Sequence, residues 1–369
     1  MSQLIRHVIT GLGMVCLYLP SYAQQKPAYV PPRQYHSYQT ESPIKIDGIA
    51  DENAWSKAVW SEDFTDIEGD KQPAPAMRTR LKMLWDNQHL YILAELEDPH
   101  IWATLHQHDT IIFQDNDFEV FVDPDGDGEK YFEIEINAHN TIMDLFMSKA
   151  YRVGGDALMT WDTRGMQTAV QIDGTLNNPL DKDKKWTVEM AIPFSAFAFF
   201  NQGLPPKDGA RWRINFSRVE WDTDIVNGQY IKRKDPKTGR SLPEHNWVWS
   251  PQGIINMHAP EKWGYLSFVA KPAGSTPVSL PLPAIEAAKE YLWDVYARQL
   301  QYRRKNGRYA STLTALGISA TTITEQGATY TLQMEGITDQ FTATLLNKNS
   351  KERCSINQEG KISQNSSNE

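Results

Sequence analysis

Three aspartates at alternate positions form the clearest group of chemically capable residues in this sequence. Asp123, Asp125 and Asp127 are separated by single residues, and Gly126 and Gly128 follow the second and the third. Calcium prefers carboxylate oxygens, and glycines permit the sharp turn that brings such oxygens together. Aspartate and glycine are also the residues that plain turns prefer. We expect either a structural calcium loop or an acidic hairpin turn here, with no part in catalysis.

Four other carboxylates lie on strand-like segments. Side chains two residues apart share a face of a strand, so Asp117 is expected beside Glu119, and Glu133 beside Glu135. Such pairs suit glycoside hydrolysis, which uses two carboxylates, but they suit calcium or hydroxyl binding equally well. Because the chain has 46 acidic residues, some pair can always be found, and these pairs alone do not indicate an enzyme.

No established catalytic motif accompanies these carboxylates. The sequence lacks Gly-x-Ser-x-Gly, His-Glu-x-x-His, the phosphate-binding P-loop and the dinucleotide fingerprint. We therefore expect a protein that is not an enzyme. If it has an activity, the expected chemistry is hydrolysis of O-glycosyl bonds by a xylanase-like glycoside hydrolase.

A loose group of histidines could hold zinc. His100, His106 and His108 lie in a polar stretch, and the last two would share a face of a strand. No third ligand follows at a convincing spacing. We therefore favour a solvated loop over a zinc site.

The composition limits the range of partners. A net charge of -9 argues against nucleic acid and against an anionic membrane. The chain of 369 residues is 40% hydrophobic and 22% charged, which is typical of a globular protein with about two domains. Aromatic residues make up 11%, with 12 tryptophans, and exposed aromatic faces commonly bind sugars. Most of the tryptophans are nevertheless expected in the core.

Residues 1–23 have the pattern of a secretion signal. Arg6 and His7 precede an apolar stretch at residues 8–19, and a small-x-small cleavage site ends at Ala23. The apolar stretch is shorter than a membrane-spanning helix, so we expect no integral membrane span after the signal is removed. The mature protein is then secreted, or retained in the periplasm or cell envelope. With the signal gone, Cys354 has no partner for an internal disulfide.

Short β-like segments separated by turn residues dominate the sequence between residues 41 and 270. They are rich in Val, Ile, Phe, Tyr and Trp and occur at residues 81–85, 90–96, 118–122, 131–136, 167–172, 186–192, 212–219 and 263–269. Few helical patterns lie between them. We therefore predict an all-β fold, an antiparallel β-sandwich, preceded by an extended, proline-bearing leader at residues 24–40.

A second, smaller unit follows a linker. Residues 271–283 are rich in Pro, Ala, Gly, Ser and Thr, which is typical of a linker. Apolar residues then recur at helical spacing until Asn306-Gly307, and three alternating strand patterns follow. Residues 284–369 are thus predicted to form a small α+β domain with one long helix and an antiparallel sheet. The stretch 301–309 resembles the soluble half of type IV pilins, although the apolar first half of the pilin helix is missing.

Several short motifs in residues 41–270 occur in the order and spacing found in one family. They are Ile-Asp-Gly at residues 46–48, Leu-Trp-Asp at 84–86, Asn-Asp-Phe-Glu-Val-Phe-Val-Asp at 116–123, Asn-Trp-Val-Trp-Ser-Pro at 246–251 and His-Ala-Pro-Glu-Lys-Trp-Gly at 258–264. In these motifs the chain resembles the family 9 carbohydrate-binding modules. The resemblance implies a β-sandwich that binds a polysaccharide or oligosaccharide, carries structural calcium and supports extracellular carbohydrate degradation without catalysis.

The resemblance also indicates a ligand face. Family members clamp a terminal sugar between two tryptophans, and Phe113 and Met257 fall at those positions here. Phe113 can still stack on a sugar ring, whereas Met257 cannot. The residues expected to bind carbohydrate are Phe113, Asn137, Arg218, Trp247 and His258, with Trp102 as a second stacking surface.

Two alternatives remain open. The chain could be an envelope interaction module whose partner protein contacts residues 284–369, or it could be a glycoside hydrolase. His258 likewise has two readings, because its imidazole could bind a sugar hydroxyl or cap the final strand.

Overall fold

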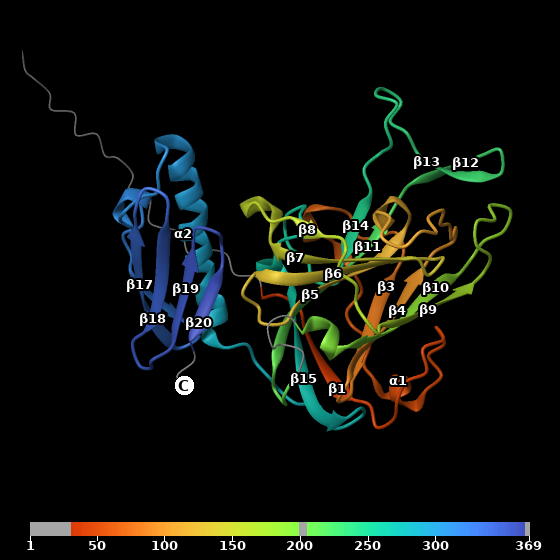
Figure 1. The fold of residues 1–369 in the computed structure, drawn as a ribbon, viewed down its shortest axis with the longest axis horizontal. Coiled ribbons are helices and arrows are strands. Elements are labelled where there is room, and N and C mark those ends of the chain that lie inside the picture. Colours follow the sequence, from red (N-terminus) through yellow and green to blue (C-terminus); the bar gives the residue numbers. More distant parts are fainter. Residues whose placement is uncertain (1–30, 199–204, 366–369) are drawn as a thin grey trace, which may run out of the picture.

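Alternation of apolar and polar side chains builds the sandwich predicted for residues 41–270 (Figure 1). The computed structural model describes residues 31–198 and 205–365. The expected secretion signal lies outside the described residues. A 13-stranded sheet runs in the order β8-β7-β6-β5-β11-β15-β1-β3-β4-β10-β9, with β14 paired to β11 and β2 paired to β14.

The strands of this sheet are short and mostly antiparallel. Only β1 pairs in parallel with its neighbours, β15 and β3, among the pairings described. The strands are β1 (Gln34–Gln39), β2 (Thr65–Asp66), β3 (Thr79–Trp85), β4 (His89–Glu97), β5 (Asp117–Asp123), β6 (Glu129–Asn137), β7 (Ile142–Lys149), β8 (Ala157–Leu158), β9 (Gln167–Asp173), β10 (Lys185–Pro193), β11 (Arg211–Glu220), β14 (His245–Val248) and β15 (Gly264–Pro272).

The core lies between two layers of this folded sheet. One layer contributes Phe118 and Val120 of β5 and Phe216 of β11, and the other contributes Met83 of β3 and Ile92 of β4. Each of these side chains is almost fully removed from solvent, so burial of apolar surface at roughly 25 cal/mol per Å² drives the closure of the sandwich. The predicted fold class is confirmed.

The N-terminal strand differs from the prediction. Residues 34–39 were expected in an extended leader but form β1, in which Tyr35 and Ser37 are buried. The Tyr35 hydroxyl donates to the carbonyl of Val59 at 2.6 Å and accepts from the N–H of Met83 at 3.0 Å. The polar composition of this segment did not predict a strand. The segment is a strand because it lies between β15 and β3, which satisfy its backbone hydrogen bonds on both sides.

Short helices and one hairpin complete the sandwich. The hairpin pairs β12 (Thr223–Val226) with β13 (Gln229–Lys232). The helical turns are α1 (Asn53–Lys57), η1 (Gly69–Lys71), η2 (Ile112–Gln114), η3 (Tyr151–Val153), η4 (Phe194–Phe197) and η5 (Pro260–Lys262).

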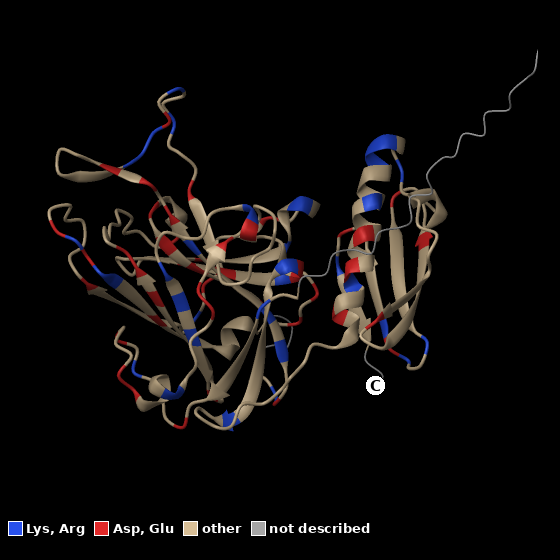
Figure 2. Ribbon diagram, turned by 180° about the vertical axis from the view of Figure 1, so that it is seen from behind, with Lys and Arg blue, Asp and Glu red and all other residues tan. Residues whose placement is uncertain are grey.

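The C-terminal unit consists of one long helix on a five-stranded antiparallel sheet, as predicted. The helix α2 (Ala284–Asn306) ends at Gly307, whose φ of 69° is the left-handed conformation that a helix C-terminus favours. Basic residues in its last turn, blue in Figure 2, lie where the helix dipole is negative. The sheet contains β16 (Thr322–Glu325), β17 (Ala328–Gly336), β18 (Phe341–Asn347), β19 (Arg353–Asn357) and β20 (Ile362–Asn365), with the turn η6 (Thr314–Leu316) before them.

Polar contacts join this unit to the sandwich. Glu286 of α2 accepts a hydrogen bond from the Tyr265 hydroxyl and lies 3.7 Å from the guanidinium of Arg213. The Lys361 ammonium lies 3.2 Å from Asp127 and 2.6 Å from Glu129. Residues 273–283, within the predicted linker, form neither helix nor strand. No helix in the described part of the chain is long and apolar enough to cross a membrane.

Candidate functional site

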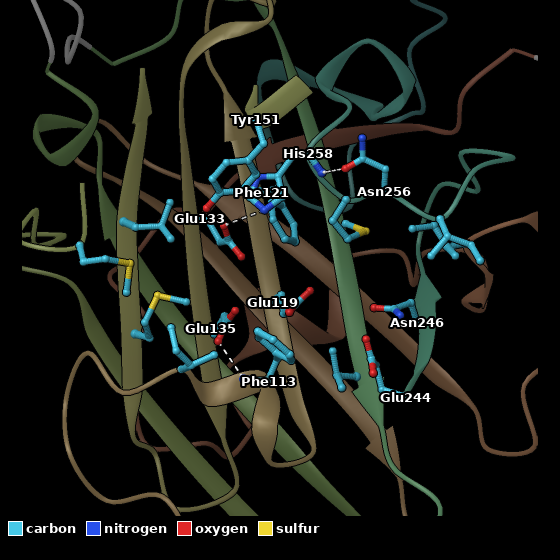
Figure 3. Close-up of a pocket in the computed structure, with 18 residues that line it drawn as sticks. Phe113, Glu119, Phe121, Glu133, Glu135, Tyr151, Glu244, Asn246, Asn256 and His258 are labelled. Carbon is cyan, nitrogen blue, oxygen red and sulfur yellow. Dashed lines mark hydrogen bonds and ion pairs between the residues drawn. The ribbon is translucent and has the colours of Figure 1, made fainter. Parts of the chain in front are cut away.

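A pocket of about 350 Å³ opens on the outer face of β5, β6 and β7 (Figure 3). Strand residues supply its floor, and the segments 244–246 and 255–258 supply one wall. Its volume lies in the range of small-molecule sites in proteins. The side chains that line it and carry polar groups are Glu119, Glu133, Glu135, Tyr151, Glu244, Asn246, Asn256 and His258.

Strand alternation places the carboxylates in this pocket. In β5, Phe118 and Val120 point into the sandwich core, so Glu119 and Phe121 point to the opposite face. In β6, Ile134 enters the core and its neighbours Glu133 and Glu135 face the pocket in the same way. The antiparallel register sets Glu119 directly opposite Glu135.

The charges of these carboxylates are not balanced by basic side chains. Among the described residues that line the pocket there is no lysine or arginine. Burial, reinforced by the charges of neighbouring carboxylates, raises the pKa of Asp117, Glu119 and Glu133 well above the usual range. Burial also raises the pKa of Glu135 to about 7, although the Phe113 N–H, at 2.9 Å, favours its charged form.

Several polar atoms of this group have no hydrogen-bond partner. They include Oδ2 of Asp117, Oε2 of Glu119 and Oε2 of Glu133. A buried carboxylate oxygen without a donor costs free energy, and native proteins keep few of them. These oxygens are therefore available to a ligand.

A histidine and a tyrosine close one end of the pocket. His258 Nδ1 lies 3.0 Å from the Tyr131 hydroxyl, and its Nε2 lies 3.6 Å from Glu133 Oε2. Burial lowers the pKa of His258 to about 4, so its imidazole is neutral near pH 7 and can donate or accept one hydrogen bond. The Tyr151 ring meets it edge-on with ring centres 4.5 Å apart, and Tyr151 is 49% exposed.

Residues 46–265 match the family model described as carbohydrate family 9 binding domain-like. The chain belongs to this family. The match ends before α2, so it does not extend to the C-terminal unit, whose resemblance to pilins stays a prediction.

Three solved structures are similar to this chain at low sequence identity. A Bacteroides uniformis protein, whose description proposes carbohydrate binding, is 17% identical, with a TM-score of 0.47 over 64% of this chain and 99% of that one. A family 9 module from Caldicellulosiruptor kristjanssonii, solved with cellotriose, is 15% identical, with a TM-score of 0.38 over 67% of this chain and 100% of that one. A family 9 module from the same organism, solved with glucose, is 16% identical, with a TM-score of 0.39 over 66% of this chain and 100% of that one. No curated protein matches the sequence.

Two of the six residues expected to bind carbohydrate line the pocket of this family 9-like domain. These are Phe113 and His258, and Met257 lies beside them. Phe113 also packs against Trp102 and Trp221, so only part of its ring faces the pocket. The two residues at the positions of the family's aromatic clamp, Phe113 and Met257, thus line the same pocket, with a methionine in place of the second ring.

The two polar residues chosen on strands do not reach this pocket. The Arg218 side chain is fully buried and binds Glu220 Oε2 at 2.8 Å and the Glu97 carbonyl at 2.8 Å. The Asn137 amide is also buried and donates to the Leu105 carbonyl at 2.9 Å. Both side chains use their hydrogen-bonding groups within the protein, which corrects the expectation that they face a ligand.

The two predicted tryptophans are also turned inward. Trp102 and Trp247 are each 5% exposed. Trp102 packs against Val219 and Trp221, whereas Trp247 joins the sandwich core and stacks on His245. Neither offers a free face in this structure.

The pocket contains residues that the sequence did not indicate as ligand contacts. Glu119, Glu133 and Glu135 were recognised as parts of carboxylate pairs that suit calcium or hydroxyl binding, but they were not placed on the ligand face, and Phe121 was not considered. Strand alternation was the signal that could have joined them, because they share one face of β5 and β6. Tyr151 begins the turn η3 and Glu244 lies in an irregular segment, and no sequence pattern places either residue near the pocket.

The predicted calcium loop connects β5 and β6. Asp123 is fully buried and accepts hydrogen bonds from the N–H groups of Gly126 and Gly128, each at 2.9 Å. Oxygens of Asp123, Asp125 and Asp127 lie within 4.8 Å of one another. This all-oxygen set fits a calcium ion. Burial, together with the charges of the other two aspartates, raises the pKa of Asp123 well above its usual range.

The three predicted histidines do not converge. His100 Nδ1 lies 3.2 Å from the Tyr230 hydroxyl, and His106 stacks on His139 with ring centres 4.0 Å apart. His108 instead lies near Asp144 and Asp162, with one potential ligand atom from each within 4.8 Å. The backbone of residues 101–106 is irregular, and the choice between a solvated loop and a metal site stays a prediction.

Proposed function

We propose that the pocket on β5 and β6 binds a carbohydrate, and that the chain holds a polysaccharide or oligosaccharide there without cleaving it. The observation that carries this proposal is the meeting of the Phe113 and Tyr151 rings with polar groups, among them the unpaired oxygen of Glu133, in one pocket. A sugar ring presents apolar C–H faces and hydroxyl groups that need partners when buried. Membership of a carbohydrate-binding family supports the same reading.

The polar groups of the pocket suit neutral hydroxyls. Carboxyl oxygens accept hydrogen bonds from hydroxyls, and a carboxyl group with a raised pKa can also donate one when it is protonated. The amides of Asn246 and Asn256 and the neutral imidazole of His258 can donate as well as accept. The lining contains no lysine or arginine that would pair with the negative group of a uronic acid or a sulfated sugar, which favours a neutral sugar.

The loop formed by Asp123, Asp125 and Asp127 is proposed to hold calcium. The ion would neutralise three carboxylates and stabilise the turn between the two strands that carry the pocket. Its expected role is structural.

We further infer that the protein acts outside the cytoplasm, where it helps a carbohydrate-degrading system to retain its substrate. The secretion signal predicted at residues 1–23 supports this location. Binding without cleavage would be sufficient for such a role.

Retention of the full chain on a panel of soluble and insoluble glycans tests the proposal, with reducing-sugar release followed in the same samples. Retention without sugar release is the expected result. Sugar release would indicate a glycoside hydrolase instead. Absence of retention on every glycan would reject carbohydrate binding and favour the interaction module, in which residues 284–369 contact an envelope protein.

A further inference from the structure

A second group of carboxylates meets at the floor of the pocket. Asp117 and Glu119 are alternate residues of β5, and Glu135 is the cross-strand partner of Glu119 on β6. One oxygen from each of the three lies within 4.8 Å of the other two. Figure 3 shows Glu119 and Glu135 near each other among the residues that line the pocket. Like charges placed directly opposite each other destabilise a sheet unless something neutralises them.

No basic side chain in the described part of the chain forms a hydrogen bond or ion pair with these three carboxylates, although the charge of Lys232 acts on Asp117 from a greater distance. Arg218 lies on the neighbouring strand β11, but its guanidinium is bound to Glu220 and to the Glu97 carbonyl. The Lys232 ammonium lies 3.3 Å from the centre of the Trp221 ring and donates to Gln114. Neither cation is hydrogen-bonded to the three carboxylates.

Two of the three carboxylates also keep an unused oxygen. Oδ2 of Asp117 and Oε2 of Glu119 are buried without a well-aligned hydrogen-bond donor, in residues that are 0% and 4% exposed. The Ser217 hydroxyl of β11 lies close enough to Glu119 to oppose the rise in its pKa, but it has no well-aligned partner either. Oδ1 of Asp117, in contrast, accepts from the Val219 N–H at 3.3 Å. Since buried acceptors in proteins are almost always satisfied, these two oxygens indicate a ligand, and the meeting of three carboxyl groups at one point favours a ligand with positive charge.

We propose that Asp117, Glu119 and Glu135 bind a divalent metal ion of the calcium type at the floor of the pocket. The ligand set contains only oxygen, which suits a hard cation and argues against zinc or copper. Calcium takes six to eight oxygens at about 2.3–2.6 Å, so three carboxylates leave coordination positions free. Those positions face the pocket, because Glu119 and Glu135 line it.

The open positions give the metal a second role, which rests on the proposed function. Hydroxyl groups of a bound sugar would replace water on the ion, so metal and carbohydrate would bind cooperatively. This site is distinct from the loop of Asp123, Asp125 and Asp127, which lies at the other end of β5.

Calcium titration of the full chain by calorimetry, without any sugar, tests the metal site alone. Glu119→Gln removes a ligand here and Asp125→Asn removes one from the loop, so the two changes separate the sites. We expect Glu119→Gln to weaken one binding event at least 30-fold while that event persists in Asp125→Asn. Glu244→Gln, which removes a carboxylate of the same pocket outside the cluster, should weaken it less than threefold.

Thermal unfolding in a chelator tests whether the variants are folded. Glu119→Gln replaces a buried acid by a neutral amide, so we expect it not to lower the melting temperature. Equal calcium binding by the wild type and by Glu119→Gln would overturn the proposal, as would complete loss of calcium binding in Asp125→Asn. Glucosamine offers an ammonium group as the alternative ligand. If the wild type binds glucosamine in chelator, Glu119→Gln does not, and no calcium binds at this site, the cluster binds an ammonium group and the proposal is overturned. Glycan retention that fails while calcium still binds would reject the proposed function only.

Discussion

Nε2 of His258 lies 3.6 Å from Oε2 of Glu133, which joins a loop before β15 to the middle of β6. The contact sets a neutral imidazole against a buried carboxyl at one end of the pocket, beside the exposed ring of Tyr151. The polar groups of His258 and Glu133 and the ring of Tyr151 therefore come from three different parts of the chain. This arrangement is the basis of the predictions for ligand binding.

Replacing Tyr151 by alanine should weaken carbohydrate binding about tenfold. The ring is half exposed and offers a stacking face, and loss of such a contact costs on the order of 1–1.5 kcal/mol. Affinity for a retained oligosaccharide can be measured by calorimetry. Leu180→Ala is a suitable control, because Leu180 is 92% exposed and does not line the pocket. Equal losses in both variants would contradict a stacking role for Tyr151.

Replacing Arg218 by alanine should destabilise the fold without changing the affinity of the folded protein for sugar. The guanidinium is fully buried beside Glu220 and Asp98, and removing one partner of a buried ion pair costs about 3–5 kcal/mol. Urea unfolding measures the first effect and calorimetry at low temperature the second. A stable variant that no longer binds glycan would restore Arg218 as a ligand residue.

These two predictions mark how far the sequence determined the site. The fold followed from strand alternation and turn residues, and the same alternation indicated the inward direction of Arg218. Arg218 has the parity of Ile214 and Phe216, both of which lie in the core. Its polar character was given more weight than its position.

Other differences could not have been predicted from a strand pattern. Asn137 shares the face of Glu133 and Glu135, but the segment before β5 covers it through the Leu105 carbonyl and Asp115. A strand pattern does not show which irregular segment will pack over a strand residue such as Asn137. Tyr151 reaches the pocket from the turn η3 for the same reason.

Acidification should weaken the contribution of Glu286 to stability. Burial opposes its ionisation, but Lys289 and Arg213 outweigh that effect and hold the pKa of Glu286 below its ordinary value of 4.5. A carboxyl with a lowered pKa in the folded state stabilises above its unfolded pKa and loses this contribution as the pH falls through the folded pKa. Glu286→Gln should therefore melt below the wild type at pH 7, and the difference should shrink below pH 4.5.

Melting curves of both proteins between pH 7 and pH 3 provide this measurement. Lys348→Gln is a control for general charge effects, since Lys348 is exposed in the C-terminal unit. A difference between wild type and Glu286→Gln that stays constant across the range would show that the charge of Glu286 does not stabilise the contact with the sandwich.

Lys361 should compete with calcium for the loop between β5 and β6. Its ammonium lies 3.2 Å from Asp127, one of the three proposed ligands. Its positive charge therefore repels a calcium ion bound to the same carboxylate. Lys361→Ala is expected to raise calcium affinity severalfold, measured in a Glu119→Gln background so that only the loop is followed. Lower or unchanged affinity would mean that the ammonium and the ion do not share Asp127.

The central claim is that the pocket binds carbohydrate through its carboxylates. Calorimetric titration of an oligosaccharide that the wild type retains, repeated with Glu133→Gln, tests it most directly, because Glu133 is buried in the pocket floor with an unpaired oxygen. The account predicts at least a tenfold loss of affinity with the melting temperature unchanged or raised. Wild-type affinity in this variant would contradict it.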